Sequence, residues 1–288
     1  MPDENIQIRV DGRIVRIARL KTEYFESLEA PVEFVDHLKK NRVKANIFTF
    51  LQSVADIEPR YAYMRRHDSL AVMSITTFEH WWKSQINDKT RNMIRRSQKA
   101  GVQVRIAEFN DDFVKGIKGI YDESPYRQGI PFKHYGKDLE TLRKSHATFI
   151  ERSDFVGAYD GDELIGFIKL VHSKGFSSLM QIVSKTSSRN KAPTNALIAK
   201  AVEICSQKSI PWLMYGVWSQ RGLGDFKRHH AFFRHDVPRY FVPLTVWGKV
   251  VLNLGLHMRL KERLPESWID FAVDLRKKWY SYKSRERV

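Results

Sequence analysis

The sequence has almost no cysteine and no long hydrophobic segment. Cys205 is the single cysteine among 288 residues, which excludes a disulfide framework and favours a reducing compartment. Because Cys205 lies in an apolar helical pattern, we interpret it as a small core residue. The longest apolar run, around Val250–Leu256, is far shorter than the roughly 20 residues that span a bilayer. The first ten residues contain no apolar segment typical of a secretory signal. We therefore expect a cytoplasmic protein, either soluble or peripheral at the inner face of a membrane.

Acidic residues are scarce relative to basic ones. The chain has 33 Asp and Glu against 49 Lys and Arg, a formal net charge of +16. This excess predicts a polyanionic partner: nucleic acid, an anionic membrane surface or a phosphorylated cofactor. Apolar residues make up 42% of the chain, which is enough for a core and argues against disorder.

Several motifs of well-known catalytic sites are missing. There is no Walker loop, no Gly-x-Ser-x-Gly elbow and no His-Glu-x-x-His pair. The histidines at 229, 230 and 235 have no cysteine nearby, so we expect no metal site.

Residues 1–75 predict a small α/β unit. Asp11-Gly12 is a typical hairpin turn. The expected elements are strands at Ile6–Val10, Ile14–Ala18, Ala45–Gln52 and Ala71–Thr76 and a helix at Val32–Lys40.

A long helix is predicted from Thr76 to Ala100. Thr76 and Glu79 fit a capping box, and Gly101 stands where a helix commonly ends. Many basic side chains lie off its apolar side: Lys83, Lys89, Arg91, Arg95, Arg96 and Lys99. They form either a solvated face or a basic wall beside an anionic substrate.

From Val102 onward the expected order is β-α-α-β-β-β-α-β-α-β. Antiparallel hairpins come first and a βαβ crossover follows, which predicts an α+β fold with a mixed, mainly antiparallel sheet. The expected strands are Val102–Phe109, Phe155–Tyr159, Leu164–His172, Phe176–Val183, Pro211–Val217 and Pro238–Val246. The expected helices are 110–123, Tyr135–His146, Thr194–Ser206 and Gly224–Phe232. The loop Ser124–Lys137 is rich in Pro, Gly and aromatic residues and is expected to line a substrate cleft.

The segment Phe176–Ser206 predicts an anion site. A strand leads into the polar, basic loop Ser184–Pro193, and a helix follows. Free backbone N–H groups and the helix dipole would both face an anion bound in the loop.

The end of the chain, residues 247–288, predicts two helices, Trp247–Arg263 and Pro265–Tyr282. Basic and apolar residues alternate in this tail. It would either lie on an anionic membrane or pack on the core and end in solvent.

Three stretches resemble the FemAB-type branch of the Gcn5-related N-acetyltransferase (GNAT) superfamily. The first is the Arg-rich segment from Lys89 that ends in Lys99-Ala100-Gly101-Val102. The second is Ala192-Pro193-Thr194-Asn195-Ala196-Leu197. The third is Gly222-Leu223-Gly224-Asp225-Phe226-Lys227. The resemblance covers about 75–245 and, more loosely, the N-terminal third.

This resemblance implies a GNAT-like sheet flanked by helices in an acyltransferase core at 76–246. The core is preceded by an N-terminal α/β extension at 1–75, interpreted as a partial or degenerate GNAT-like half. A basic amphipathic helical tail at 247–288 follows it. The implied activity is acyl transfer to an amine, with acyl-CoA as the donor in most of the superfamily and aminoacyl-tRNA in the peptidoglycan-bridge enzymes.

The resemblance also assigns site residues. The pyrophosphate loop corresponds to Arg189–Thr194, but Ala192 and Thr194 stand where the family has glycine. The expected cofactor-binding residues are Gln181, Val183, Ser188, Arg189, Lys191, Asn195 and Ala196. The expected substrate-binding residues are Arg91, Arg95 and Tyr126.

Amide formation requires a neutral amine, a polarised carbonyl and a proton for the leaving group, and no protein nucleophile. Polarisation is expected from a backbone N–H at a bulge in the strand Phe176–Val183. The candidate catalytic side chains are Lys227, Tyr215 and His229. Each has a structural alternative: a surface lysine, a core tyrosine and a structural histidine. We interpret Asp225 as a helix N-cap.

Three functions stay open. The first is an acyl-CoA-dependent N-acyltransferase acting on an amine, in cell-envelope or polysaccharide biosynthesis. The second is an aminoacyl-tRNA-dependent transferase of the FemAB type. The third is a catalytically inactive GNAT-fold binding module at an anionic membrane surface.

Overall fold

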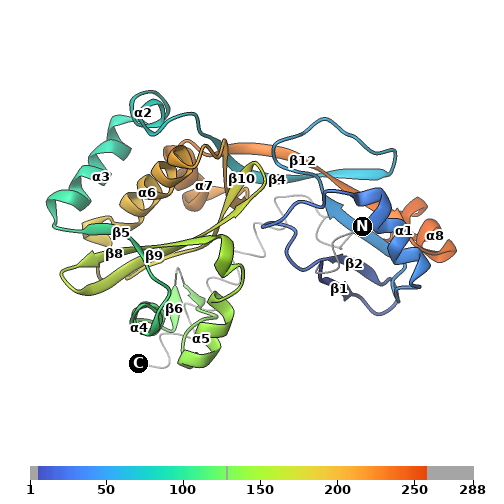
Figure 1. The fold of residues 1–288 in the computed structure, drawn as a ribbon, viewed down its shortest axis with the longest axis horizontal. Coiled ribbons are helices and arrows are strands. Elements are labelled where there is room, and N and C mark those ends of the chain that lie inside the picture. The colour runs from blue at the N-terminus through green and yellow to red at the C-terminus, as the bar shows by residue number, and fades with distance from the viewer. Residues whose placement is uncertain (1–5, 128, 258–288) are drawn as a thin grey trace.

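The computed structural model describes residues 6–127 and 129–257, apart from the side chain of Arg221. Ten strands form one continuous sheet in the order β1-β2-β3-β12-β4-β11-β10-β9-β8-β5 (Figure 1). Only β2–β3 and β10–β11 pair in parallel within this described sheet. The prediction of a mixed, mainly antiparallel sheet flanked by helices is therefore confirmed.

The strands of the large sheet have the following bounds: β1 Ile8–Asp11, β2 Ile17–Leu20, β3 Ile47–Leu51, β4 Met64–Ser74, β5 Gln103–Ala107, β8 Ser153–Asp160, β9 Glu163–Ser173, β10 Phe176–Ser184, β11 Trp212–Val217 and β12 Phe233–Pro243. A separate hairpin consists of β6 Tyr126–Arg127 and β7 Ile130–Pro131.

The helices have the following bounds: α1 Pro31–Lys40, α2 Phe78–His80, α3 Asp88–Lys99, α4 Asp111–Tyr121, α5 Leu139–His146, α6 Pro193–Gln207, α7 Arg221–His229 and α8 Val246–Asn253. A π-helical turn, Trp81–Gln85, follows α2, and two 3₁₀ turns lie at Ile150–Arg152 and Arg189–Lys191.

The molecule has a smaller lobe, which contains β1–β3, α1 and α8, and a larger lobe, which contains α2–α7 and β5–β11 (Figure 1). Two long strands, β4 and β12, run through both lobes. Where they leave the smaller, N-terminal lobe, Arg239 on β12 is held by two carboxylates. Its Nη1 donates to Glu23 at 2.8 Å and its Nη2 to Asp68 at 2.7 Å. The guanidinium is almost fully buried, so this ion pair ties the N-terminal lobe to the sheet.

The larger lobe has a core on each face of the sheet. Helix α6 packs against β8, β9 and β10 on one face, with α3 outside it, while α4 and α5 cover the other face (Figure 1). Because both faces are covered, β9 is buried continuously from Leu164 to Val171.

The prediction of one long helix at residues 76–100 is wrong. The chain leaves the helical conformation at Ile86, which is buried and extended, and Asn87 caps a new helix by accepting from the Thr90 N–H at 2.9 Å. The first helix is capped by Thr77, not by Thr76. A contact distant in sequence fixes this break, because the Thr90 hydroxyl donates to the His229 carbonyl at 2.9 Å.

Other predicted boundaries shift. Strand β4 begins at Met64 and β12 at Phe233, both earlier than expected, because the two strands pair along most of their length. Helix α7 begins at Arg221, so Asp225 lies inside the helix and pairs with Arg228; the predicted N-cap role is wrong. Helix α8 ends at Asn253. The rest of the predicted tail, residues 258–288, lies outside the described residues.

Candidate active site

A gap opens in the larger lobe where β10 and β11 separate. The two strands pair in parallel only through Ser177–Leu213 and Ser178–Met214. Beyond that point β10 continues along β9, while β11 rejoins β4 at Val217. The first four residues of β10 are buried and the last five are half-buried, as expected for a strand that loses its neighbour on one side.

A β-bulge lies at the mouth of this gap. The β9–β10 register shifts between Leu179 and Gln181, which leaves Met180 as the extra residue. A bulge takes backbone polar groups out of the regular ladder and re-aims the chain. The predicted bulge in this strand is therefore confirmed, at the point where β11 departs.

Two of the three predicted catalytic side chains lie on the β11 side of the gap. Lys227 Nζ donates to the Val217 carbonyl at 2.7 Å and to the Ser219 hydroxyl at 3.3 Å, and lies 4.7 Å from the centre of the Tyr215 ring. Burial lowers the pKa of Lys227 to about 8 and raises the pKa of Tyr215 to about 12. The third predicted residue, His229, has an exposed side chain at the end of α7.

A glycine allows α7 to hold Lys227 against β11. A Cβ atom at Gly224 would stand 2.1 Å from the Ser219 carbonyl oxygen. Only glycine permits this close approach, which gives a physical reason for one glycine of the Gly-Leu-Gly sequence.

The loop between β10 and α6 contains most of the predicted cofactor-binding residues. Its own backbone already uses many of its N–H groups: those of Arg189, Lys191 and Asn195 donate to carbonyls of Thr186, Ser188 and Ala192. The Lys191 side chain pairs with Asp160. On the adjoining strand, Gln181 hydrogen-bonds the Tyr121 hydroxyl and Val183 pairs with Phe167. Of the other predicted members, Ser188 precedes the 3₁₀ turn, and Ala196 is buried in the first turn of α6.

The sequence interpretation missed Glu123, which binds this loop. Its Oε2 accepts from the Thr186 N–H at 2.6 Å, and its Oε1 accepts from the Ser187 N–H at 2.8 Å. Burial alone would raise the pKa of Glu123, but the hydrogen bonds from Ser187 and Thr186 lower it to about 2. A glutamate near the end of a helix is unfavourable with the helix dipole, which makes Glu123 unusual but does not indicate which N–H groups it meets.

The predicted substrate-binding residues have three different environments. Arg95 lines a groove described below. Arg91 is engaged in the break between helices, where Nη1 donates to the carbonyls of Trp82 and Ile86, each at 2.7 Å. Tyr126 lies in β6 beside the end of β10, because its neighbour Arg127 donates to the Ser184 carbonyl at 2.7 Å.

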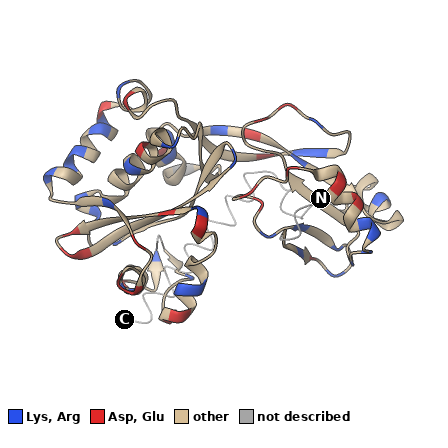
Figure 2. Ribbon diagram, in the orientation of Figure 1, with Lys and Arg blue, Asp and Glu red and all other residues tan. Residues whose placement is uncertain are grey.

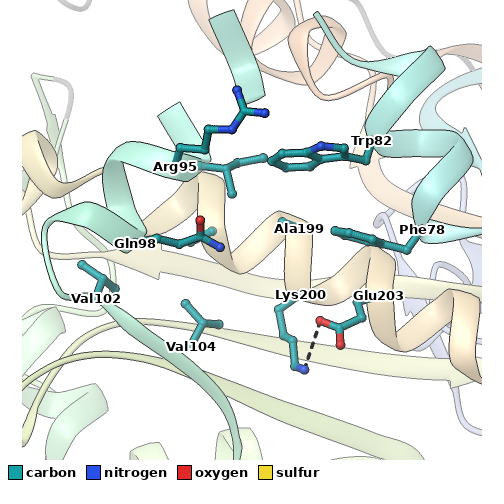
Figure 3. Close-up of a pocket in the computed structure, with 11 residues that line it drawn as sticks. Phe78, Trp82, Arg95, Gln98, Val102, Val104, Ala199, Lys200 and Glu203 are labelled. Carbon is teal, nitrogen blue, oxygen red and sulfur yellow. Dashed lines mark hydrogen bonds and ion pairs between the residues drawn. The ribbon is translucent and has the colours of Figure 1, made fainter. Parts of the chain in front are cut away.

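The groove has a volume of about 420 Å³ and lies between α3 and α6 (Figure 3). Phe78 and Trp82 form an aromatic wall, and the Arg95 guanidinium lies 5.6 Å from the Trp82 ring centre. Lys200 and Glu203 on α6 pair at 3.1 Å across the groove floor. Its lining includes no residue of the Lys227–Tyr215 pair.

A Ser-His-Asp chain also occurs, on the α6 face of the sheet. His172 Nε2 lies 2.8 Å from Asp154 Oδ2, and His172 Nδ1 lies 2.8 Å from Ser177 Oγ. Ser177 is completely buried, so its hydroxyl has no access to a substrate. We assign this chain to the packing of β8, β9 and β10.

The described residues contain neither a membrane-spanning helix nor a metal-binding cluster. No helix among residues 6–127 and 129–257 is long and apolar enough to cross a membrane. In the same part of the chain, no cluster of His, Cys, Asp or Glu has the arrangement of a metal site.

Comparison with known proteins identifies the fold. No protein-family model matches the sequence, and no curated protein sequence matches it significantly. Among solved structures, FemX matches with a TM-score of 0.60 at 9% identity, over 81% of this chain and 83% of FemX. The C-terminal domain of a lysylphosphatidylglycerol synthetase from Agrobacterium fabrum matches with a TM-score of 0.57 at 12% identity, over 86% of this chain and 83% of that domain. The fold is GNAT-like, of the FemAB type. L-PGS from Bacillus licheniformis matches with a TM-score of 0.55 at 12% identity, over 81% of this chain and 80% of L-PGS.

Proposed function

We propose that the protein is an acyltransferase that joins an activated acyl group to an amine in the gap between β10 and β11. The observation that carries the proposal is the separation of these strands beside the Met180 bulge, with a buried lysine on the opposite wall. The bulge takes the Met180 backbone out of the ladder with β9 on one side, and Lys227 is a cation on the other. These are the groups that stabilise a carbonyl oxygen as it becomes negative.

Each wall of the gap has a role in this mechanism. The backbone at Met180 polarises the acyl carbonyl. Lys227 has donated two of its three N–H groups to described residues, and the third is available to the developing oxyanion. With a pKa of about 12, the Tyr215 hydroxyl is protonated at neutral pH and is the proposed proton donor to the leaving group. The new C–N bond forms as the bond to the leaving group breaks, and the leaving group takes the Tyr215 proton. The amine proton leaves to solvent, and solvent reprotonates the Tyr215 phenolate.

The donor expected from the sequence is acyl-CoA, with its phosphates in the loop after β10. A specific observation favours the second donor, aminoacyl-tRNA: the loop N–H groups are already bonded within the protein. Basic residues recur along the ribbon of α3 (Figure 2), and Lys89, Arg96 and Lys99 on this helix have no ion-pair partner among the described residues. Such a basic surface suits an RNA backbone. The structural similarity to the lysylphosphatidylglycerol synthetase domain adds support for aminoacyl transfer and for an acceptor in the cell envelope.

Arg95 and the groove of Figure 3 provide a binding place for a remote part of a large substrate. The aromatic wall suits an apolar or planar group, and Arg95 suits an anionic one.

The test is a donor screen with product detection. The protein is incubated with acetyl-CoA, longer acyl-CoAs and a set of aminoacyl-tRNAs, together with amine acceptors, and mass spectrometry detects the new amide. We expect transfer from an aminoacyl-tRNA. Transfer from acyl-CoA alone would support the proposed acyltransferase activity and contradict aminoacyl-tRNA as its donor. Consumption of neither donor, with no thermal shift by either, would favour the inactive binding module.

A further inference from the structure

The loop between β10 and α6 has the cations of a phosphate site. Lys185, Arg189 and Lys191 all lie in it. Helix α6 begins directly afterwards at Pro193, and no side chain caps its first turn. A phosphate would therefore meet positive charge and a helix N-terminus here.

A carboxylate of the protein itself occupies the loop instead. Glu123 spans two successive backbone N–H groups, those of Thr186 and Ser187, and its Oε1 also accepts from the Ser187 hydroxyl at 2.6 Å. Successive N–H groups that converge on one anion are the usual geometry of a phosphate-binding nest. The Glu123 side chain thus holds the position that one phosphate group would take.

A second residue holds Glu123 in place. Arg127 Nη2 lies 3.4 Å from Glu123 Oε2 and also donates to the Ile120 carbonyl at 2.7 Å, while Nη1 donates to the Ser184 carbonyl at 2.7 Å. This guanidinium therefore joins the end of α4, the end of β10 and the glutamate. With a pKa near 2, Glu123 stays ionised throughout the physiological range.

Both lysines of the loop are already paired. Lys185 pairs with Glu163, and Lys191 pairs with Asp160. Glu123 is a third carboxylate at the loop. An incoming phosphate finds both ammonium groups engaged, and it meets repulsion at the two N–H groups that would bind it best.

We propose that Glu123 is a specificity-determining residue that keeps phosphate groups, including the diphosphate of nucleotide thioesters, out of this loop. The inference rests on the proposed function, since it explains why a GNAT-like core would take a donor other than CoA. Removal of the carboxylate should convert the loop into a phosphate site.

Calorimetric titration of inorganic pyrophosphate and of CoA into the full chain tests the proposal. We expect no binding of either to the wild type at millimolar concentration. Glu123→Ala should bind both at least tenfold more tightly, and Glu123→Gln should lie between, because its amide oxygen still accepts one hydrogen bond. Glu163→Ala is the matched control: it removes the same charge beside the loop but frees no backbone N–H group. It should gain less than threefold.

Each outcome has a defined meaning. Tight binding of CoA to the wild type would overturn the proposal while supporting a CoA-dependent acyltransferase. Equal gains in Glu123→Ala and Glu163→Ala would overturn it in favour of a general charge effect. No gain in Glu123→Ala, with its thermal unfolding still cooperative, would also overturn it. Because binding is the readout, none of these results depends on whether acyl transfer has been detected.

Discussion

Lys227 on α7 and Lys169 on β9 are both almost fully buried, and burial lowers the pKa of each to about 8. Their surroundings differ. Lys169 Nζ donates to the His146 carbonyl at 2.6 Å, to the Thr148 hydroxyl at 3.2 Å and also to the Thr148 carbonyl. Lys169 thus binds the chain at the end of α5, and each of its three N–H groups has an acceptor. Lys227 keeps one donor and stands beside the gap.

The comparison teaches that a lowered pKa does not identify a catalytic lysine. Desolvation acts on both side chains alike. The distinguishing features of Lys227 are an N–H group without an acceptor among the described residues and a position beside the separation of β10 and β11. We therefore propose that Lys169 contributes to stability and Lys227 to the reaction.

The largest expected effect is on catalysis by Lys227→Met. Loss of the cation should lower kcat/KM by roughly 100- to 1000-fold, the usual result of removing one oxyanion donor. The melting temperature should fall less than in the Lys169 variant described next, because the acceptors set free belong to the exposed Val217 and the half-buried Ser219, and methionine retains the apolar contact with Tyr215. Steady-state kinetics and thermal unfolding measure the two effects. A variant with wild-type turnover would remove Lys227 from the mechanism.

Lys169→Met should do the reverse. It removes the charged donor to the carbonyls of the buried His146 and of Thr148, which should lower the free energy of unfolding by about 2–4 kcal/mol. Chemical denaturation measures this loss. The kcat of the folded fraction should stay within about threefold of wild type. A Lys169→Met variant that folds well but is inactive would contradict the separate roles proposed for the two lysines.

A smaller effect is expected in the pH profile. The folded pKa of Lys227, about 8, lies below its ordinary value of 10.5, so its cation is lost as pH rises through 8. The rate should therefore fall above pH 8, and Lys227→Arg should extend the plateau because arginine stays charged. The pH dependence of kcat, measured for both proteins, checks this. If kcat falls above pH 8 in the same way for the wild type and for Lys227→Arg, a group other than Lys227 causes the fall.

The smallest effect is expected at an exposed lysine. Lys115 pairs with Asp112 on the surface of α4, with an exposed fraction of 63% for the lysine. Lys115→Met should change stability by less than about 0.5 kcal/mol and leave turnover unchanged. A larger loss in either measurement would mean that removal of any lysine disturbs this strongly basic chain, and the comparison would lose its control.

Several elements of the larger lobe were predictable because their signals are local. The hairpin turn at residues 160–163, the Asn110 cap of α4 and the proline that begins α6 each lie within the segment they shape. The motif around Lys227 also pointed to that residue. Its burial could not be read from the sequence, since it depends on Gly224 packing against the Ser219 carbonyl.

Features made by contacts distant in sequence were not predictable. The break before α3 depends on Thr90 reaching His229. Glu123 meets the loop 63 positions further along the chain. A single sequence gives no signal for which carboxylate will meet which N–H group.

Amide hydrogen exchange with and without an acyl donor tests most directly whether the donor binds where β10 and β11 separate. The donor would be an RNA that carries an amide-linked, and therefore unreactive, aminoacyl group. The account predicts slower exchange at residues 180–184 of β10 and 215–217 of β11, with the loop amides of Thr186 and Ser187 unchanged. Protection confined to the groove between α3 and α6, with both strands unaffected, would contradict it.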